Sequence, residues 1–275
     1  MTAPDNPVGS HGTGALLTFV AMAFGWTWSL LWVGATFTLH PAWLNTTIII
    51  AAAFGPSLAG VTTVALFDRL VGVKRWLKRC LFWRVGWGWF AIAAIVPMGM
   101  MVLALILYAA MGGAIPPSPA AGNLWLSVLI FGQILLLGGP LGEEFGWRGY
   151  ALPLLTPRIG WRRASLTVGG VWALWHLPLF FIPGMAQANM PIALFMASSV
   201  ALSVIFARLS VNTRFSVLPA IMLHWSINAG SWAIPVTPQG GVMLPYYLVM
   251  GVLFAIAILV FFKPGPSPSD ESFGE

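Results

Sequence analysis

Two adjacent carboxylates, Glu143 and Glu144, lie in an otherwise apolar stretch of the chain, with Arg148 one helical turn beyond the second. A charged side chain in hydrocarbon costs from about 2.5 to more than about 10 kcal/mol, so charged residues are rare there unless they serve a function. The other acidic residues lie in the two tails or at the edge of a basic segment. A buried carboxylate without a cation can take a proton from water, which makes this pair a candidate for general base catalysis.

Three more polar side chains occur in later apolar stretches: His176 in VWALWHLP, then His224 and Asn228 in MLHWSINA. At a helical rise of about 1.5 Å per residue, these groups and Glu143 lie roughly 10 to 16 Å into their spans. We therefore expect three separate helices to bring four polar side chains into one layer of the membrane.

The two glutamates differ in their expected surroundings. Side chains four residues apart share a helix face, so Glu144 can pair with Arg148, and His224 lies one turn from Asn228. Glu143 points about 100° away from Glu144 and is left without an evident cation. A carboxylate beside arginine is held as the anion and is the weaker base. Glu143 is therefore the predicted base, and Glu144 with Arg148 the predicted supporting pair.

Glycines and a proline surround this pair in the segment GGPLGEEFGWRG. Gly138, Gly139 and Pro140 should interrupt the helix just before the glutamates. Gly142 and Gly146 should let another backbone approach closely, because they carry no Cβ. The segment is thus predicted to combine a helix break with a tight helix contact.

The composition is that of a membrane protein. The 275 residues are 59% hydrophobic and 7% charged, whereas soluble domains carry about 25% charge. The single cysteine, Cys80, excludes an internal disulfide framework. We predict an all-α, polytopic bundle of about eight transmembrane helices of about 20 residues each, near residues 15–37, 45–66, 86–111, 123–152, 165–182, 191–209, 217–236 and 244–262.

The net charge of +6 comes from Lys and Arg in short loops, as expected when positive charge holds loops on the cytoplasmic side. We therefore expect no nucleic-acid partner, and a multi-pass protein of the cell membrane with both termini cytoplasmic. Residues 1–14 are the predicted N-terminal tail, 15–262 the transmembrane domain and 263–275 a disordered tail. The basic segment 68–84 is predicted to lie along the lipid headgroups as an amphipathic helix.

Each polar group taken alone has a structural explanation. A buried Glu–Arg pair can simply link helices, and an intramembrane histidine or asparagine can form an interhelical hydrogen bond. The coincidence of four groups at one depth, with Glu143 lacking a cation, favours a functional site.

Taken in order, the three motifs resemble those of the CPBP intramembrane proteases, the family of CAAX prenyl endopeptidases and of bacteriocin-processing and immunity proteins. They are Glu143-Glu144-x-x-x-Arg148, a histidine in the following span, and His224-x-x-x-Asn228, and the similar region covers roughly residues 123–232. The family's second motif is usually Phe-x-x-x-His, whereas Trp172 stands at that position here. This change is expected to leave the chemistry intact and to alter the pocket.

The resemblance implies an intramembrane endopeptidase with a cytoplasm-facing cavity, acting on a membrane-associated or CAAX-like peptide or protein. It implies that Glu143 and His176 activate water and that His224 and Asn228 stabilise the oxyanion. The lipid bilayer is the other expected partner. Two alternatives stay open: a proton-coupled transporter, which inverted repeats would favour although none is evident, and a noncatalytic scaffold of the immunity-protein type.

Members of this family have also been classed as metalloproteases, and Glu143, His176 and His224 would match the His2Glu ligand set of hydrolytic zinc sites. The chain has no H-E-x-x-H segment. If Glu143 bound zinc, the base would have to be Glu144, which Arg148 would weaken. We favour glutamate catalysis without a cofactor, with zinc as the alternative.

Overall fold

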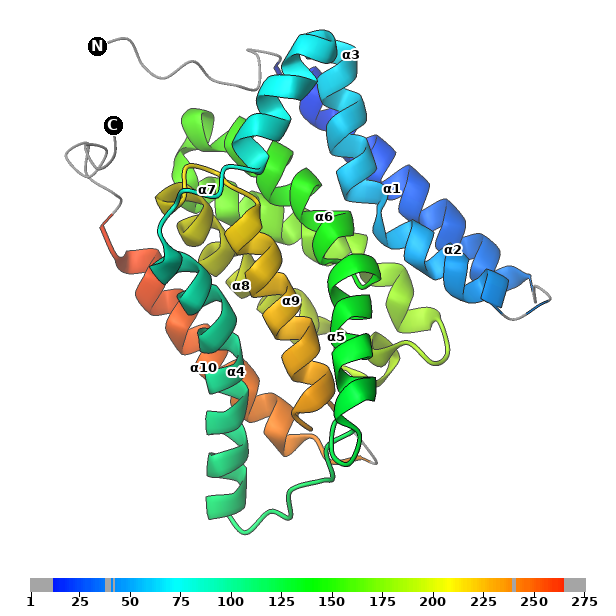
Figure 1. Cartoon of the computed structure of the whole chain (residues 1–275), viewed down its shortest axis with the longest axis vertical. Helices are drawn as coiled ribbons and strands as arrows, with labels where there is room; N and C mark the ends of the chain where they lie inside the picture. The colour runs from blue at the N-terminus through cyan, green and yellow to red at the C-terminus, as the bar shows by residue number, and fades with distance from the viewer. Residues whose placement is uncertain (1–11, 38–40, 42, 239–240, 265–275) are drawn as a thin grey trace.

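The computed structural model describes residues 12–37, 41, 43–238 and 241–264. Helices make up most of these residues, and no β-strand occurs among them (Figure 1). The all-α fold class is therefore confirmed. Most of both predicted tails, residues 1–11 and 265–275, lies outside the described residues, so the division into tails and transmembrane domain stays a prediction.

The long helices follow the apolar runs of the sequence. Their bounds are α1 Thr13–Thr36, α2 Trp43–Ala53, α3 Gly55–Cys80, α4 Trp87–Ala110, α5 Leu124–Leu137, α6 Pro140–Gly146, α7 Leu152–Trp175, α8 Ile192–Asn212, α9 Leu218–Ala233 and α10 Leu244–Phe262. A π-helical turn, η1 (Trp147–Ala151), joins α6 to α7, and two 3₁₀ turns, η2 (Leu177–Phe181) and η3 (Ala186–Asn189), follow α7.

Six helical stretches among the described residues are long and apolar enough to cross a membrane. One of them, residues 125–181, is a run of consecutive helices that covers most of two predicted spans, 123–152 and 165–182. The predicted span 45–66 is divided between the 11-residue α2 and the start of α3, and the predicted span 217–236 is the 16-residue α9. The polytopic bundle is thus observed, although some of the eight predicted spans are divided between two helices or form a shorter helix.

The end of α3 departs from the prediction for the basic segment 68–84. The helix continues to Cys80 with one non-helical residue, Arg69, whose φ is 58°. Trp76 is only 2% exposed, and its indole nitrogen donates a hydrogen bond to the carbonyl oxygen of Gly149 at 2.8 Å. Trp76 therefore anchors α3 to the protein core and not to the lipid headgroups, whereas Trp83 is 57% exposed.

A missing hydrogen-bond donor next to η1 explains why the end of α3 packs against that turn. Pro153 has no N–H, so the carbonyl of Gly149, four residues earlier, lacks its usual helical partner. The Trp76 indole and the Arg79 guanidinium fill that role, at 2.8 and 2.6 Å. The end of α3 thereby holds the π-helical turn that directly follows the two glutamates.

The predicted helix break before the glutamates is confirmed. α5 ends at Leu137, and Gly139 has a φ of 106°, a backbone conformation that glycine adopts readily and other residues rarely adopt. Pro140 then begins α6, where its fixed φ suits the first turn of a helix.

The predicted close approach at Gly142 and Gly146 is also confirmed. A Cβ at Gly142 would lie 2.5 Å from the carbonyl oxygen of Ala53, and one at Gly146 would overlap the carbonyl of Pro56. Both glycines therefore let α6 press against the junction of α2 and α3 (Figure 1).

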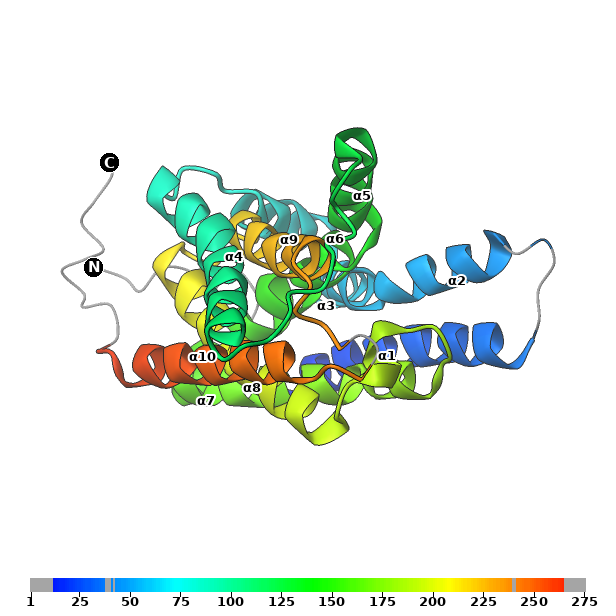
Figure 2. The ribbon, with the colours of Figure 1, turned by 90° about the horizontal axis from the view of Figure 1, so that it is seen from below.

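The basic segments gather at one end of the bundle. Arg162 donates to the carbonyl oxygens of Phe261 and Lys263 at 2.6 and 2.8 Å, and Arg208 donates to that of Pro264 at 2.7 Å. At the end of α3, the carbonyl oxygen of Cys80 accepts from the amide of Val217 at 2.8 Å, at the start of α9. These contacts bring together the segments that the sequence predicts to be cytoplasmic, while α1 and α2 extend sideways from the bundle (Figure 2).

Candidate active site

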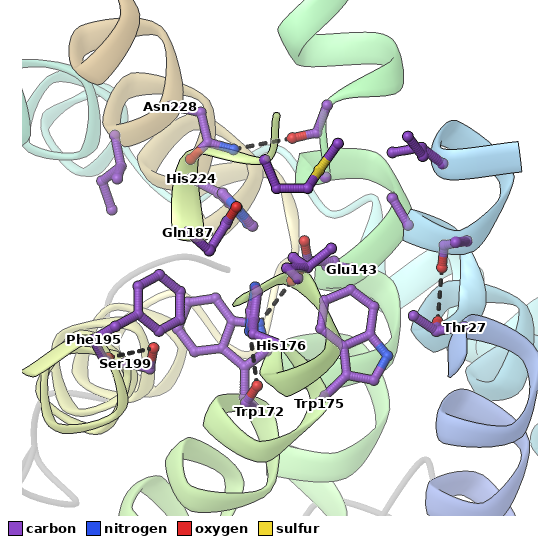
Figure 3. A pocket seen from close by; sticks show the side chains of 18 of the residues that line it. Thr27, Glu143, Trp172, Trp175, His176, Gln187, Phe195, Ser199, His224 and Asn228 are labelled. Atoms are coloured by element: carbon purple, nitrogen blue, oxygen red, sulfur yellow. Dashed lines mark hydrogen bonds between the residues drawn. The ribbon is translucent and has the colours of Figure 1, made fainter. Parts of the chain in front are cut away.

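All four predicted catalytic side chains line one cavity of about 320 Å³ (Figure 3). Glu143 comes from α6, His176 from the end of α7, and His224 and Asn228 from α9. Much of the remaining wall is apolar and includes Leu31, Ile49, Ile50, Phe195 and Leu202. The predicted meeting of three helices at one polar centre is therefore observed.

The position of His176 differs from the prediction. It lies inside the apolar helical run of residues 125–181, but α7 ends at Trp175 and His176 is its C-terminal cap. The 3₁₀ turn η2 follows directly. His176 thus reaches the cavity from a helix end and not from the middle of one continuous helix.

Glu143 is buried, with 5% of its surface exposed. Its Oε2 accepts a hydrogen bond of 2.7 Å from the indole nitrogen of Trp172. Its Oε1 lies near Gly139, where an added Cβ would be 2.7 Å from that oxygen and 3.5 Å from Nε2 of His224. The space left open by Gly139 therefore lies beside one carboxylate oxygen and one imidazole nitrogen.

Glu144 is fully buried and contacts two partners through one oxygen. Its Oε1 accepts from Arg148 at 3.1 Å, which agrees with the predicted pair, and lies 2.7 Å from Nδ1 of His224. The guanidinium of Arg148 lies over the ring of Trp172 at 4.3 Å and over that of Phe206 at 3.9 Å. Glu144 thus orients a histidine of the site as well as pairing with the arginine.

The hydrogen bonds determine which ring nitrogen of each histidine is left to bind a substrate or a water molecule. Nδ1 of His176 lies 2.8 Å from the carbonyl oxygen of Trp172, and a carbonyl only accepts, so Nδ1 carries the hydrogen and Nε2 of the neutral ring is an acceptor. Nδ1 of His224 donates in the same way to the carboxylate of Glu144. Both Nε2 atoms are therefore left for a substrate or water.

Asn228 fastens the helix break to α9. Its side-chain nitrogen donates to the carbonyl oxygen of Gly138 at 3.0 Å (Figure 3). A primary amide carries two N–H groups, so one remains for a group bound in the cavity. This hydrogen bond therefore fixes the side chain of Asn228 relative to the helix break before Glu143.

Sequence reasoning missed two contacts of this site, that of Glu144 with His224 and that of Trp172 with Glu143. The first leaves no local signal, because the partners are 80 residues apart. The second has a weak one, since a buried indole N–H usually finds an acceptor, and Trp172 lies one helical turn before His176.

The three residues of the zinc alternative do not form a ligand set. Within the described ranges, no three His, Cys, Asp or Glu side chains are gathered closely enough to hold a metal ion. In addition, Oε2 of Glu143 is engaged by Trp172. As placed here, Glu143 has only Oε1 free of a protein partner, and the choice between glutamate catalysis and zinc stays a prediction.

One part of the cavity wall comes from the segment after η2, which carries no Lys or Arg and supplies Met185 and Gln187.

Comparison with known proteins agrees with the site. Residues 123–230 match the model of the type II CAAX prenyl endopeptidase Rce1-like family. This match covers the helix break, both glutamates, both histidines and Asn228, and it supports the resemblance to the CPBP family.

A curated relative gives the more particular similarity. The chain is 29% identical over 168 residues to CAAX prenyl protease 2 of Methanococcus maripaludis. The alignment covers 58% of this chain and 60% of the relative, so the chain spans less than two thirds of that protein's length.

Substitution of Gly139 tests the space between Glu143 and His224. Gly139→Ala is expected to lower turnover by about 100-fold, because the new Cβ displaces the carboxylate of Glu143. The positive φ adds strain of about 1–3 kcal/mol. Turnover and thermal unfolding of the purified protein measure both effects. The matched control is Gly132→Ala in α5, where a Cβ meets nothing within 4 Å; equal losses in the two variants would contradict the expected clash with Glu143.

Proposed function

We propose that the protein is an intramembrane endopeptidase that hydrolyses a peptide bond with water activated by Glu143. The observation that carries the proposal is the common cavity of Glu143, His176, His224 and Asn228. The family match and the similarity to a CAAX prenyl protease support the same activity.

In the first step, a water molecule lies between Oε1 of Glu143 and Nε2 of His176. It donates one hydrogen bond to each, so that its lone pair faces the scissile carbonyl carbon. Glu143 takes one proton as the new C–O bond forms. The hydrogen bond from Nδ1 of His176 to the carbonyl of Trp172 supports this role, because it leaves Nε2 as the acceptor.

In the second step, the oxyanion is stabilised by the free N–H of Asn228 and by Nε2 of His224 in its protonated form. The carboxylate of Glu144, 2.7 Å from Nδ1, stabilises the positive charge on that ring, as a carboxylate does beside a catalytic histidine. Collapse of the tetrahedral intermediate breaks the C–N bond. Glu143 returns its proton to the departing nitrogen, which leaves a carboxylic acid and a free amine, and the acid then loses its proton to solvent.

The supporting pair acts on the shape of the site. Arg148 neutralises Glu144 and is held between the rings of Trp172 and Phe206. Glu144 lies in α6 and Arg148 lies within the π-helical turn η1, a deviation that is frequent at functional sites. Glu144 and Arg148 thus position His224 and do not contact the reacting atoms.

The proposed substrate is a membrane-associated peptide with a CAAX-like end. The relative is named a CAAX prenyl protease, and the cavity wall carries aliphatic side chains such as Leu31, Ile49 and Ile50, which suit an apolar segment. We further propose a cell-membrane location with both termini cytoplasmic, on the support of the basic segments that meet at one end.

Cleavage by the purified protein tests the proposal. The protein in lipid vesicles is expected to cut a farnesylated CAAX peptide at one bond, with one oxygen from labelled water in the new carboxylate. Mass spectrometry of the products measures both the position and the label. The same peptide without the prenyl group is the substrate control, and a well-folded protein that cuts neither peptide would favour the transporter or the scaffold.

The same cleavage assay tests whether the reaction requires a metal ion. Cleavage is expected to continue at an unchanged rate after exhaustive chelation, with no stoichiometric zinc in elemental analysis, because Glu143 itself takes the proton. Loss of cleavage that zinc restores would overturn the metal-independent mechanism in favour of a zinc hydrolase.

A further inference from the structure

Trp172 contacts four charged or polar side chains at the base of the site. Its indole nitrogen donates to Oε2 of Glu143 at 2.7 Å, and the residue is only 4% exposed. Its ring packs edge-on against His176 and His224, with centroids 5.3 and 6.0 Å apart. The guanidinium of Arg148 lies 4.3 Å from its centroid. Figure 3 shows the indole beside Glu143 and His176 on the floor of the cavity.

We propose that Trp172 is the positioning residue of this protease site, and that its indole N–H holds the carboxylate of Glu143 in the orientation needed to activate water. The proposal rests on the proposed function. It assigns to this chain a hydrogen bond that a phenylalanine at the same place could not make.

The geometry explains why one hydrogen bond matters here. A carboxylate on a helix can rotate about its side-chain bonds, and rotation would exchange the oxygen that faces the water. With Oε2 bound to Trp172, the remaining oxygen, Oε1, faces the space beside Gly139 and Nε2 of His224. The indole therefore decides which oxygen is free for the reaction.

The backbone of Trp172 also orients a group of the site, His176. Its carbonyl oxygen accepts from Nδ1 of His176 at 2.8 Å, which presents Nε2 as an acceptor. One residue thus orients both groups that would hold the water, Glu143 through its side chain and His176 through its main chain.

Trp172→Phe removes the donor and retains an aromatic ring against Arg148 and the two histidines. We expect kcat to fall by about 10- to 100-fold, because the base is no longer held in line with the water. The KM should stay close to that of the wild type, since the cavity wall remains apolar. A change in KM with unchanged kcat would indicate a role in the pocket shape alone and would overturn the proposal.

The matched control is Trp225→Phe. Trp225 also donates its indole hydrogen, to the carbonyl oxygen of Phe131 at 2.9 Å, and it does not line the cavity. This variant should retain the wild-type kcat. If both variants lose kcat equally, the effect belongs to buried indole hydrogen bonds in general and not to Glu143.

A second measurement does not depend on turnover. In protein carrying isotope-labelled tryptophan, the indole signal of Trp172 is identified by its absence from Trp172→Phe in an NMR spectrum. This signal is expected to move when Glu143 is replaced by alanine, which removes the acceptor. An unmoved signal overturns the proposed contact. A moved signal, together with a wild-type protein that cleaves no peptide, supports the contact and counts against the proposed protease function instead.

Discussion

A Glu143→Gln variant is expected to fold like the wild type and to lose peptide cleavage by about 10²- to 10⁴-fold. The amide has nearly the shape of the carboxylate but cannot accept the proton that water must lose. Rates of product formation, with the thermal unfolding temperature measured on the same preparation, test the two halves of this expectation.

The structure explains why the fold should survive this change. The side-chain oxygen of glutamine can still accept the hydrogen bond that Trp172 donates to Glu143, and the main-chain bond from the amide of residue 143 to the carbonyl of Gly139 is unaffected. Wild-type turnover in a folded Glu143→Gln protein would exclude the proposed base. A shared loss of turnover and stability would mean that Glu143 is structural.

Glu144→Gln is expected to have the largest effect on stability. Breaking a buried ion pair by removing one partner costs about 3–5 kcal/mol, because the other charge is left buried without compensation. Arg148 is 1% exposed, so water cannot solvate its guanidinium. Unfolding in detergent or in lipid vesicles should therefore begin at a clearly lower temperature than in Glu143→Gln.

A double variant separates the two roles of Glu144. Replacing the pair by apolar residues, as in Glu144→Leu with Arg148→Met, should recover most of the stability, since such replacements of buried pairs are often neutral. Cleavage should remain low, because Nδ1 of His224 has lost its acceptor. Recovery of cleavage along with stability would show that the contact with His224 is dispensable.

The residues of the site could be predicted from the sequence because polar groups in hydrocarbon are costly and therefore conspicuous. Glu143, His176, His224 and Asn228 were selected by residue type and depth, and one cavity contains them all. The pairing of Glu144 with Arg148 and the helix break before Pro140 follow from local rules of helix geometry, and both are present. The all-α membrane fold follows equally from the length and apolarity of the helical segments.

The contacts between helices were decided only by the tertiary structure. The rotation of each helix about its axis determines which side chains meet, and spacing along one helix carries no information about its neighbour's rotation. For this reason the bond from Trp172 to Glu143 and the second role of Glu144 appear only in the folded chain.

The basic segment at the end of α3 also shows the difference between what the sequence predicts and what the folded structure decides. Its composition indicated a surface helix, yet Trp76 is buried because the carbonyl of Gly149 lacks a helical donor and recruits the indole. Sequence alone therefore predicted which polar groups come together in the cavity. The tertiary structure decided which atom of each group is free to act, because hydrogen bonds from distant segments occupy the others.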